Sequence, residues 1–457
     1  MLFSSISFLY YFLPCVLVLY FLVPRHFKNI ILLMASLFFY GWGEPRLVFL
    51  MLITIAVGYI LGLLTEKHAK YKKVYVVLAT VCFLGILGYF KYADFFISSF
   101  NSATGLSVPL LKVALPIGIS FYTFQILSYN IDVYRGEVAA QKNPIYLATY
   151  ITMFPQLIVG PIVRYTDVEE QLEKRTHSVD KVALGIRRFI FGLSKKILLA
   201  NVLGELCEVF RSSDEKSVLF YWMYAVAFAL QIYFDFSGYS DMAIGLGKIL
   251  GFDFLENFNY PYIAGSITEF WRRWHISLGN WFRDYVYIPL GGPRVKAARR
   301  FFNILVVWML TGLWHGASWN FVLWGLYFAV LLIIEKRFLL DVLRKCKVLN
   351  HLYVLFAVVI SFVIFNATSL SQLMSDVGGL FGSGNIPLVS IESIYYLKSY
   401  AVVFLLAILG ATPFPNKIIS KIKWIQYVEP IVLLVLLIVI TAYLVDGSFN
   451  PFLYFRF

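Results

Sequence analysis

The sequence predicts an all-α membrane protein that crosses the bilayer many times. Of its 457 residues, 60% are hydrophobic and only 14% are charged, whereas soluble globular proteins have about 25% charged residues. The apolar residues form long runs, and most Lys and Arg lie in the short loops between them. Since about 20 apolar residues cross a bilayer, these observations predict a bundle of roughly 10–12 transmembrane helices.

The net charge of +13 is explained by orientation in the membrane. Clusters of basic residues lie in five loops, at residues 25–28, 67–73, 294–300, 344–347 and 417–423. This distribution is the positive-inside pattern, and such loops attract anionic lipid headgroups. Because the chain has no polar domain that could present a nucleic-acid surface, we expect membrane lipids and no nucleic acid as partners.

We expect the first predicted helix to be retained in the mature protein. Its apolar run, Ile6–Val23, is followed by the basic cluster, which is the reverse of a secretory signal, so the N-terminus is predicted outside the cell. The further predicted spans are Ile30–Trp42, Leu47–Leu64, Val74–Phe90, Tyr146–Val163, Ala183–Leu203, Ser217–Phe234, Phe301–Leu313, Trp319–Glu335, His351–Phe365, Ser399–Ala411 and Val428–Leu444. Several are too short to cross, which indicates tilted, re-entrant or buried segments.

The middle of the chain, from Pro116 to Tyr287, is unusually polar for a membrane protein. A polar side chain facing lipid is costly, so polar residues there line a cavity, pair with each other or lie at an interface. Helix-breaking Pro and Gly occur in the same stretch, and irregular backbone at membrane depth needs protein or water around it. The sequence therefore predicts a tunnel lined by protein.

His315 is the first candidate for chemistry. It follows the predicted helix Phe301–Leu313, whose 13 residues span only about 20 Å, so the turn is expected to be recessed in the membrane. Gly312 and Gly316 would allow a tight backbone there. A buried imidazole loses its charged form and can accept a proton. The sequence context alone equally allows a histidine that only packs against its neighbours.

His275 is the second candidate, in the segment ITEFWRRWHISLGNWFRDYVYIPLGG. Its alternating aromatic and charged residues suit an amphipathic helix that anchors at the membrane interface. The functional alternative is that His275 points into the tunnel while Arg272 and Arg273 bind the phosphates of a donor. The polar residues Ser237, Ser240 and Asp241 share one helical face. They either bind substrate or form a structural row of hydrogen bonds to a neighbouring segment.

Motifs of several other enzyme classes are absent from the sequence. It contains no Walker loop, GxSxG elbow, CxxC pair or HExxH motif, and no metal site is predicted. A transporter or flippase for a lipid-linked sugar remains open, because polar midplane residues and broken helices also mark transporters. Transporters often contain internal repeats, and none is evident here.

Two long motifs resemble those of a known family. The run from Phe234 to Gly292 and the following LTGLWHGASWNFVLWG are similar to the membrane-bound O-acyltransferases. The first residues, MLFSSISFLYYFLPCVLVLYFLVP, and the segment FYTFQILSYNIDVYRGEV resemble the same family's bacterial branch, which acetylates alginate or peptidoglycan or D-alanylates teichoic acids. The resemblance covers nearly the whole chain.

The resemblance implies an O-acyltransferase in the bacterial cytoplasmic membrane with a tunnel for an activated acyl donor. It implies that His315 is catalytic and that His275 is the second polar position beside it. In acetylating members the usual donor is acetyl-CoA, with no bound cofactor. An extracytoplasmic SGNH-type O-acetyltransferase is the implied partner. The alternative within the family is D-alanyl transfer to teichoic acid.

The C-terminal tail, FNPFLYFRF, separates these alternatives. The last basic loop precedes the last predicted span, so both termini are predicted outside the cell. We divide the chain into an acyltransferase domain, residues 1–445, and an aromatic tail, residues 446–457. By its residues alone the tail is an interfacial anchor. However, FLYFRF resembles a terminal motif of acetylating members, which implies that Tyr454 accepts the acyl group and relays it outward.

Overall fold

Helices are the regular secondary structure of the described part of the chain. The computed structural model describes residues 1–343, 345–446 and 453, and these residues form helices and loops without any strand. The predicted all-α fold class is therefore confirmed. The chain forms two compact units, the first from Met1–Phe189 and Asp241–Leu255 and the second from Ile190–Ser240 and Glu256–Phe457.

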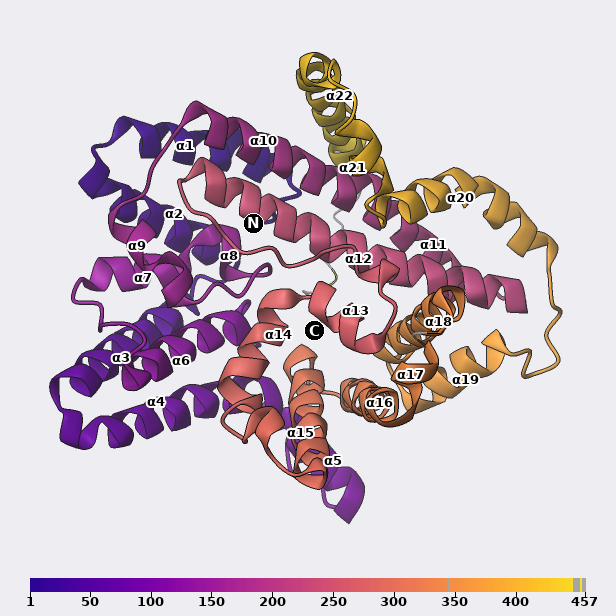
Figure 1. Cartoon of the computed structure of the whole chain (residues 1–457), viewed down its shortest axis with the longest axis horizontal. Helices are drawn as coiled ribbons and strands as arrows, with labels where there is room; N and C mark the ends of the chain where they lie inside the picture. Colours follow the sequence, from indigo (N-terminus) through magenta and orange to yellow (C-terminus); the bar gives the residue numbers. More distant parts are fainter. Residues whose placement is uncertain (344, 447–452, 454–457) are drawn as a thin grey trace. The chain divides into compact units, whose positions relative to one another are not determined.

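The first unit is built around a buried polar helix. Its helices are α1 (Leu13–Leu22), α2 (Lys28–Gly43), α3 (Val48–Lys67), α4 (Lys72–Leu87), α5 (Ala93–Thr104), α6 (Ile119–Arg135), α7 (Pro144–Thr152), α8 (Phe154–Leu157), α9 (Tyr165–Glu173) and most of α10 (Val179–Ser194). Helix α6 is buried along most of its length and packs on α3 and α4 (Figure 1). Glycines allow this contact, since a Cβ on Gly58 would lie 2.4 Å from Ile126.

The second unit holds both candidate histidines. Its helices are α11 (Val202–Ser212), most of α12 (Val218–Ile249), α13 (Ile267–Arg273), α14 (Ile276–Phe282), α15 (Ala297–His315), α16 (Trp319–Ile334), α17 (Leu340–Leu343), α18 (Lys347–Asn366), α19 (Leu370–Leu380), α20 (Ile391–Gly410), α21 (Phe414–Ile419) and α22 (Ile425–Asp446). Helices α15 and α16 form a hairpin, and α18 packs beside α16 (Figure 1).

Helices α10 and α12 contribute to both units and approach each other closely within each. In the first unit a Cβ on Gly185 would lie 2.6 Å from the carbonyl oxygen of Gly245. In the second unit a Cβ on Gly238 would lie 2.7 Å from the carbonyl oxygen of Gly192. Small residues at such crossings let helix backbones pack directly, which is common among membrane helices.

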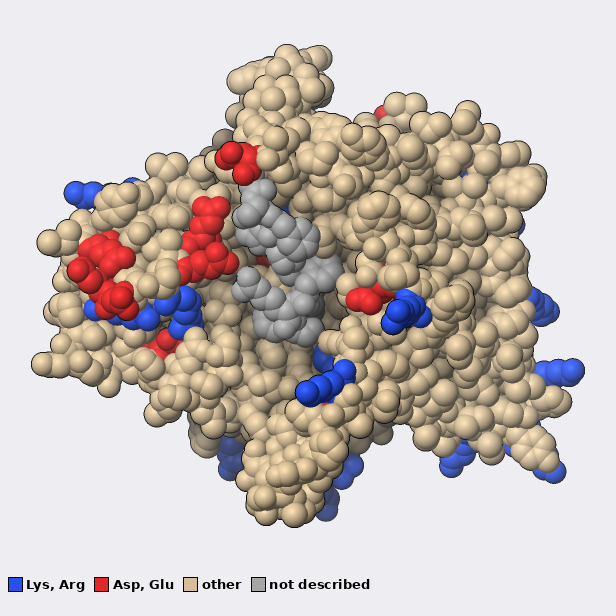
Figure 2. Space-filling view, turned by 180° about the vertical axis from the view of Figure 1, so that it is seen from behind, with Lys and Arg blue, Asp and Glu red and all other residues tan. Residues whose placement is uncertain are grey.

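The described residues include six helical segments long and apolar enough to cross a membrane. They are Val48–Lys67, Ala69–Thr104, Val218–Ile249, Lys347–Asn366, Ile391–Gly410 and Ile425–Asp446, and Ser7–Leu22 is a shorter apolar helix. Only 6% of the apolar window of α22 is buried. The surface in Figure 2 is mostly uncharged, with the charged residues in small groups. The chain is a polytopic membrane protein, although these segments are fewer than the predicted 10–12.

Several predicted spans differ from the observed helices; Ser217–Phe234, for example, is only the first part of α12. The stretch Tyr146–Val163 is broken into α7 and α8, since Pro155 cannot continue a helix from α7. The predicted span Ala183–Leu203 lies within a longer helical run that includes α10 and α11. The helix before His315 has 19 residues instead of 13, because it begins inside the basic loop and includes His315 itself.

Candidate active site

Helix α13 is fixed at its first turn by a buried carboxylate. Glu335 is 0% exposed and accepts hydrogen bonds from the backbone N–H groups of Ile267, at 2.6 Å, and Thr268, at 3.1 Å. Its Oε1 also accepts from the Thr268 hydroxyl at 2.7 Å. A negative charge at a helix N-terminus is favourable, so Glu335 sets the position of the segment that leads to His275.

His275 occupies a strained backbone position between α13 and α14. Its φ is +45°, in the left-handed region that disfavours side chains with a Cβ. Asn257 holds the turn, because its Oδ1 accepts from the backbone N–H of Ser277 at 3.1 Å and its carbonyl oxygen accepts from the N–H of Ile276 at 3.0 Å. The strain is thus supported by hydrogen bonds and aims the imidazole into the interior.

The same asparagine sets the tautomer of His275. Its Oδ1 lies 3.2 Å from Nδ1 of His275, and since an amide oxygen only accepts, Nδ1 carries the proton. Nε2 is then the basic nitrogen, and it has no hydrogen-bond partner among the described residues. His275 lies outside the six candidate spans. Burial lowers the pKa of His275 well below its usual range, and the nearby His315 lowers it further. The ring is therefore neutral at pH 7.

His315 is the last residue of α15 and is 5% exposed. Its turn depends on close packing between α15 and α16. A Cβ on Gly312 would lie 2.2 Å from the carbonyl oxygen of Phe321, and one on Gly316 would lie 2.2 Å from the Phe321 ring. Neither glycine has a positive φ, so their role is to make room for α16 and not to bend the chain.

The two histidines are brought together around one indole. The ring centroid of Trp314 lies 5.7 Å from that of His275 and 5.0 Å from that of His315. Trp324 and Phe365 pack against His315 at 5.0 and 5.4 Å, and Phe236 packs against His275 at 4.6 Å. The two buried imidazoles are thus surrounded mainly by aromatic side chains. Such apolar surroundings disfavour the charged form of an imidazole.

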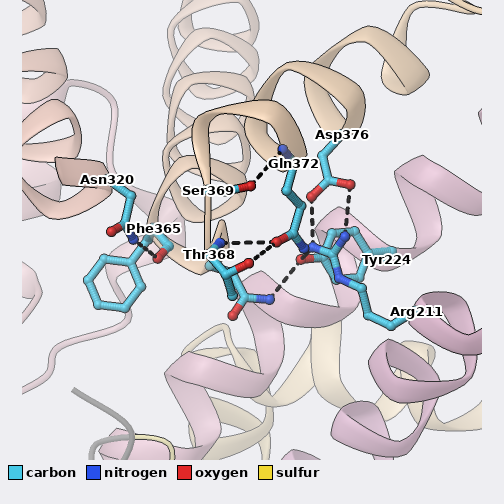
Figure 3. A network of polar contacts seen from close by, with 9 residues as sticks. Arg211, Tyr224, Asn320, Phe365, Thr368, Ser369, Gln372 and Asp376 are labelled. Carbon is cyan, nitrogen blue, oxygen red and sulfur yellow. Dashed lines mark hydrogen bonds and ion pairs between the residues drawn. The ribbon is translucent and has the colours of Figure 1, made fainter. Parts of the chain in front are cut away.

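A polar network behind His315 was not predicted from the sequence. Arg211 donates to both carboxylate oxygens of Asp376, at 2.8 and 2.7 Å, and also to the hydroxyl of Tyr224. That hydroxyl accepts from Asn366 at 2.7 Å, and Asn320 donates to the carbonyl oxygen of Phe365 at 2.9 Å (Figure 3). The network fixes the end of α18, whose Phe365 contacts His315. Its partners lie up to 165 residues apart, so no sequence spacing indicates them.

The two predicted donor-binding arginines have different surroundings. Arg273 is paired with Glu269, at 2.8 Å, and donates to the carbonyl oxygen of Asn259 at 3.1 Å. Arg272 is exposed and forms no hydrogen bond or ion pair within the described part of the chain. Arg272 is therefore the more available of the two, whereas Arg273 is already used to fold its own segment.

The serines and aspartate of α12 do not form a joint site. Asn257 donates to Oγ of Ser240 at 3.3 Å, whereas Asp241 pairs with Arg188 at 2.9 Å. The Ser237 hydroxyl has no hydrogen-bond partner among the described residues, so only Ser240 and Asp241 have the structural contacts that a hydrogen-bonding row requires. Asp235, one turn before Ser240 on the same helix, has a more specific contact. It pairs with Lys196 at 2.5 Å, and both side chains are buried.

The acyl-acceptor candidate, Tyr454, lies outside the described residues, and its role stays a prediction, as does the division at residue 445. Its neighbour Leu453 is described and is 5% exposed. Leu453 packs in the same hydrophobic core as Trp274 and Phe365. Its backbone N–H donates to Oδ2 of Asp235 at 2.9 Å. This residue of the tail is therefore bound inside the second unit.

Comparison with known proteins agrees with the resemblance seen in the sequence. Residues 35–375 match the model of the MBOAT, membrane-bound O-acyltransferase family. The chain is 43% identical to the protein named probable alginate O-acetylase AlgI of Pseudomonas aeruginosa, over 84% of this chain and 75% of that protein. It is 32% identical to the peptidoglycan O-acetyltransferase of Helicobacter pylori, over 85% of this chain and 81% of that protein.

A more distant similarity exists to the teichoic acid D-alanyltransferase of Bacillus subtilis. The identity is 30%, and it covers 47% of this chain and 58% of that protein. The family match spans most of the chain, including both histidines and the helices that carry them. The chain therefore belongs to the membrane-bound O-acyltransferase family and is a membrane O-acyltransferase.

Proposed function

We propose that this chain takes acetyl groups from acetyl-CoA at the cytoplasmic side of a bacterial cell membrane and passes them outward for O-acetylation of a cell-surface polysaccharide. The names of its relatives support this, since they act on alginate or on peptidoglycan. The polymer is peptidoglycan, an alginate-like polysaccharide or another cell-wall polymer. An extracytoplasmic SGNH-type O-acetyltransferase completes the transfer.

The observation that carries the proposal is the pair of buried imidazoles around Trp314. Their rings lie 5.7 and 5.0 Å from the same indole, and they are 1% and 5% exposed. A site of this kind excludes bulk water, which protects a thioester from hydrolysis. It also leaves neutral nitrogens that can accept a proton from an attacking hydroxyl.

In the proposed reaction His315 is the general base. Its neutral ring nitrogen removes the phenolic proton of Tyr454 as the phenolate oxygen attacks the thioester carbonyl carbon. The carbon–sulfur bond then breaks, the coenzyme A thiolate takes the proton back from His315, and an acetyl-tyrosine ester remains. The serine of the extracytoplasmic partner attacks that ester, which restores the Tyr454 hydroxyl. His275 assists by binding or orienting the reacting groups.

The tail contact supports Tyr454 as the carrier. Leu453, the residue before it, is bound to buried Asp235 in the unit that contains both histidines. In this proposal Arg272 and Arg273 hold the phosphates of the donor, with Arg272 the more available. Both chain termini lie outside the cytoplasm, which places the acetylated tail on the side of the partner.

The test compares polysaccharide acetylation in cells that express wild type, His315→Ala or His68→Ala at equal levels. His68 lies in the loop that follows α3 in the first unit, so its variant controls for loss of any histidine. Loss of a general base typically lowers a rate by about 10²–10⁴-fold, and acetylation should therefore fall to background only in His315→Ala. Normal acetylation in that variant would rule out His315 as the base.

D-alanyl transfer to teichoic acid is the second candidate function. The similarity to the Bacillus subtilis D-alanyltransferase favours it, although this similarity covers less than half of the chain. Purified protein in vesicles should consume labelled acetyl-CoA and leave a D-alanyl carrier thioester intact. The opposite preference would select the second candidate, and movement of a lipid-linked sugar without donor consumption would select a flippase.

A further inference from the structure

A group of cations in the first unit has no acidic partner. The group, here called the cationic cluster, consists of Arg25, Lys28 and Arg175. Lys28 begins α2 and is only 8% exposed, and its ammonium forms no hydrogen bond or ion pair among the described residues. Its contacts are cation–π, with the rings of Tyr20 at 4.5 Å and Phe21 at 5.1 Å. The aliphatic stem of Lys28 is therefore covered, while its ammonium charge remains available to an anion.

Arg175 is held in place by neutral groups alone. Its Nε donates to the Tyr20 hydroxyl at 2.8 Å, and its Nη1 donates to Oδ1 of Asn29 at 2.7 Å and to the carbonyl oxygen of Gln171 at 3.3 Å. Its Nη2 makes no hydrogen bond among the described residues. The guanidinium is therefore oriented but not neutralised, and one edge remains available to an anion.

The loop that carries Arg175 is rigid. Tyr20 is 0% exposed, and its hydroxyl donates to the carbonyl oxygen of Leu250 at 2.6 Å. Nε2 of His177 lies 3.0 Å from the same hydroxyl. Gly251 has φ +86°, and a Cβ on it would lie 3.2 Å from the carbonyl oxygen of Thr176. The ends of α1, α9 and α12 therefore present the cations on a preorganised surface.

The local electrostatic field is positive. Burial and the charges of Lys28, Arg175 and Arg25 together lower the pKa of His177 to about 4. The nearby acidic residues Glu173 and Asp180 are exposed and form no ion pair with the cationic cluster. A helix N-terminus adds partial positive charge, since α2 begins at Lys28 without a side-chain cap.

We propose that the cationic cluster binds the phosphate group of an anionic membrane lipid. Phosphate matches a guanidinium edge and a neighbouring ammonium. The choice of a lipid over a soluble phosphate follows from the adjacent side chains. Phe21, Leu22 and Phe27 are exposed and apolar, and they flank the cations where acyl chains would lie. The cationic cluster contains neither catalytic candidate, and the proposed lipid binding does not depend on the proposed acetyl transfer.

The test measures lipid binding by native mass spectrometry of the full chain in detergent, with phosphatidylglycerol as the probe. Lys28→Met keeps the apolar stem and removes a charge that makes no hydrogen bond, so folding should be unchanged. A basic residue near a membrane surface contributes about 1 kcal/mol to binding anionic lipid, so affinity should fall about fivefold. Lys28→Met/Arg175→Gln should lose about 25-fold, and Lys28→Arg should bind like wild type.

The matched control is Lys70→Met/Arg294→Gln, which removes two exposed basic residues outside the cationic cluster. This control should retain wild-type affinity. Zwitterionic phosphatidylcholine should bind equally weakly to all variants. Equal phosphatidylglycerol affinity in wild type and Lys28→Met would overturn the site. Binding of inorganic phosphate as tight as that of the lipid would overturn the assignment to a lipid.

Discussion

The backbone N–H of Leu453 donates to Oδ2 of Asp235 at 2.9 Å, while Oδ1 of the same carboxylate accepts from Nζ of Lys196 at 2.5 Å. The two side chains are 3% and 2% exposed. A buried carboxylate with a spare lone pair is a strong acceptor for a peptide N–H. This contact holds Leu453 in the unit that contains His275 and His315.

The first prediction concerns this contact. Asp235→Asn breaks the buried ion pair with Lys196, and breaking a buried pair by removing one partner typically costs about 3–5 kcal/mol. We expect a large loss of thermal stability and of polysaccharide acetylation. Lys196→Met/Asp235→Leu removes both charges, so stability should recover. Acetylation should stay low, because the N–H of Leu453 has lost its acceptor. Wild-type acetylation by the double variant would show that the contact is dispensable.

His275→Asn removes the imidazole while keeping a residue that tolerates the positive φ at this position, so it tests the role of the imidazole apart from that of the turn. Asn is tolerated at positive φ better than most residues, so the turn at φ +45° should persist and the protein should remain folded. If the imidazole binds or orients the reacting groups, the acetylation rate should fall, although less than in His315→Ala. Rates are measured with purified protein at saturating and limiting donor. Equal losses in the two variants would give His275 a role as large as that of His315.

Gly312→Ala tests the contact between α15 and α16. The added methyl would lie 2.2 Å from the carbonyl oxygen of Phe321, and a backbone atom cannot move aside as a flexible side chain can. Overpacking typically costs about 1–3 kcal/mol, so we expect a lower melting temperature. The control is Gly85→Ala in α4, where an added Cβ has no atom within 4 Å. Equal melting temperatures for both variants would contradict the tight helix contact.

The stability of the first unit should decrease at acidic pH through His177. Its pKa is about 4 in the folded chain and near 6.5 when unfolded. A lowered folded-state pKa gives stability that is complete above pH 6.5 and is lost as the pH falls toward 4. The melting temperature in detergent should thus decrease between pH 7 and pH 5, and His177→Gln should reduce this decrease. An identical pH dependence in the variant would assign the effect to other groups.

The sequence predicted the architecture well where one physical signal dominates. Long apolar runs such as Val48–Lys67 and Ile425–Asp446 form helices. Neither lipid nor an apolar protein core can hydrogen-bond to the backbone, so the N–H and C=O groups must bond to each other within the helix. Tyr146–Val163 was predicted as one span from its hydropathy, although Pro155 had been identified as a helix breaker and the structure divides the stretch into α7 and α8. The length of α15 was underestimated, since Ala297–Arg300 are polar or small yet continue the helix.

The site was predictable in part for a similar reason. His275 and His315 stand out in the sequence because their surroundings are aromatic and apolar, and the structure places them at the same indole. Asn257, Asp235 and Arg211 could not be linked to them, because their partners come from distant segments. Asn257 had no distinguishing feature in the sequence, although it determines both the turn and the tautomer of His275.

The most direct test of acetyl relay is mass spectrometry of the C-terminal peptide. Purified chain in vesicles is incubated with isotopically labelled acetyl-CoA, then digested and analysed. We predict one labelled acetyl group on Tyr454 in the wild type and none in His315→Ala. Tyr454→Phe should show no label on this peptide and no acetylated polysaccharide in cells. Normal polysaccharide acetylation by Tyr454→Phe, or equal labelling of the tail in His315→Ala, would contradict the relay.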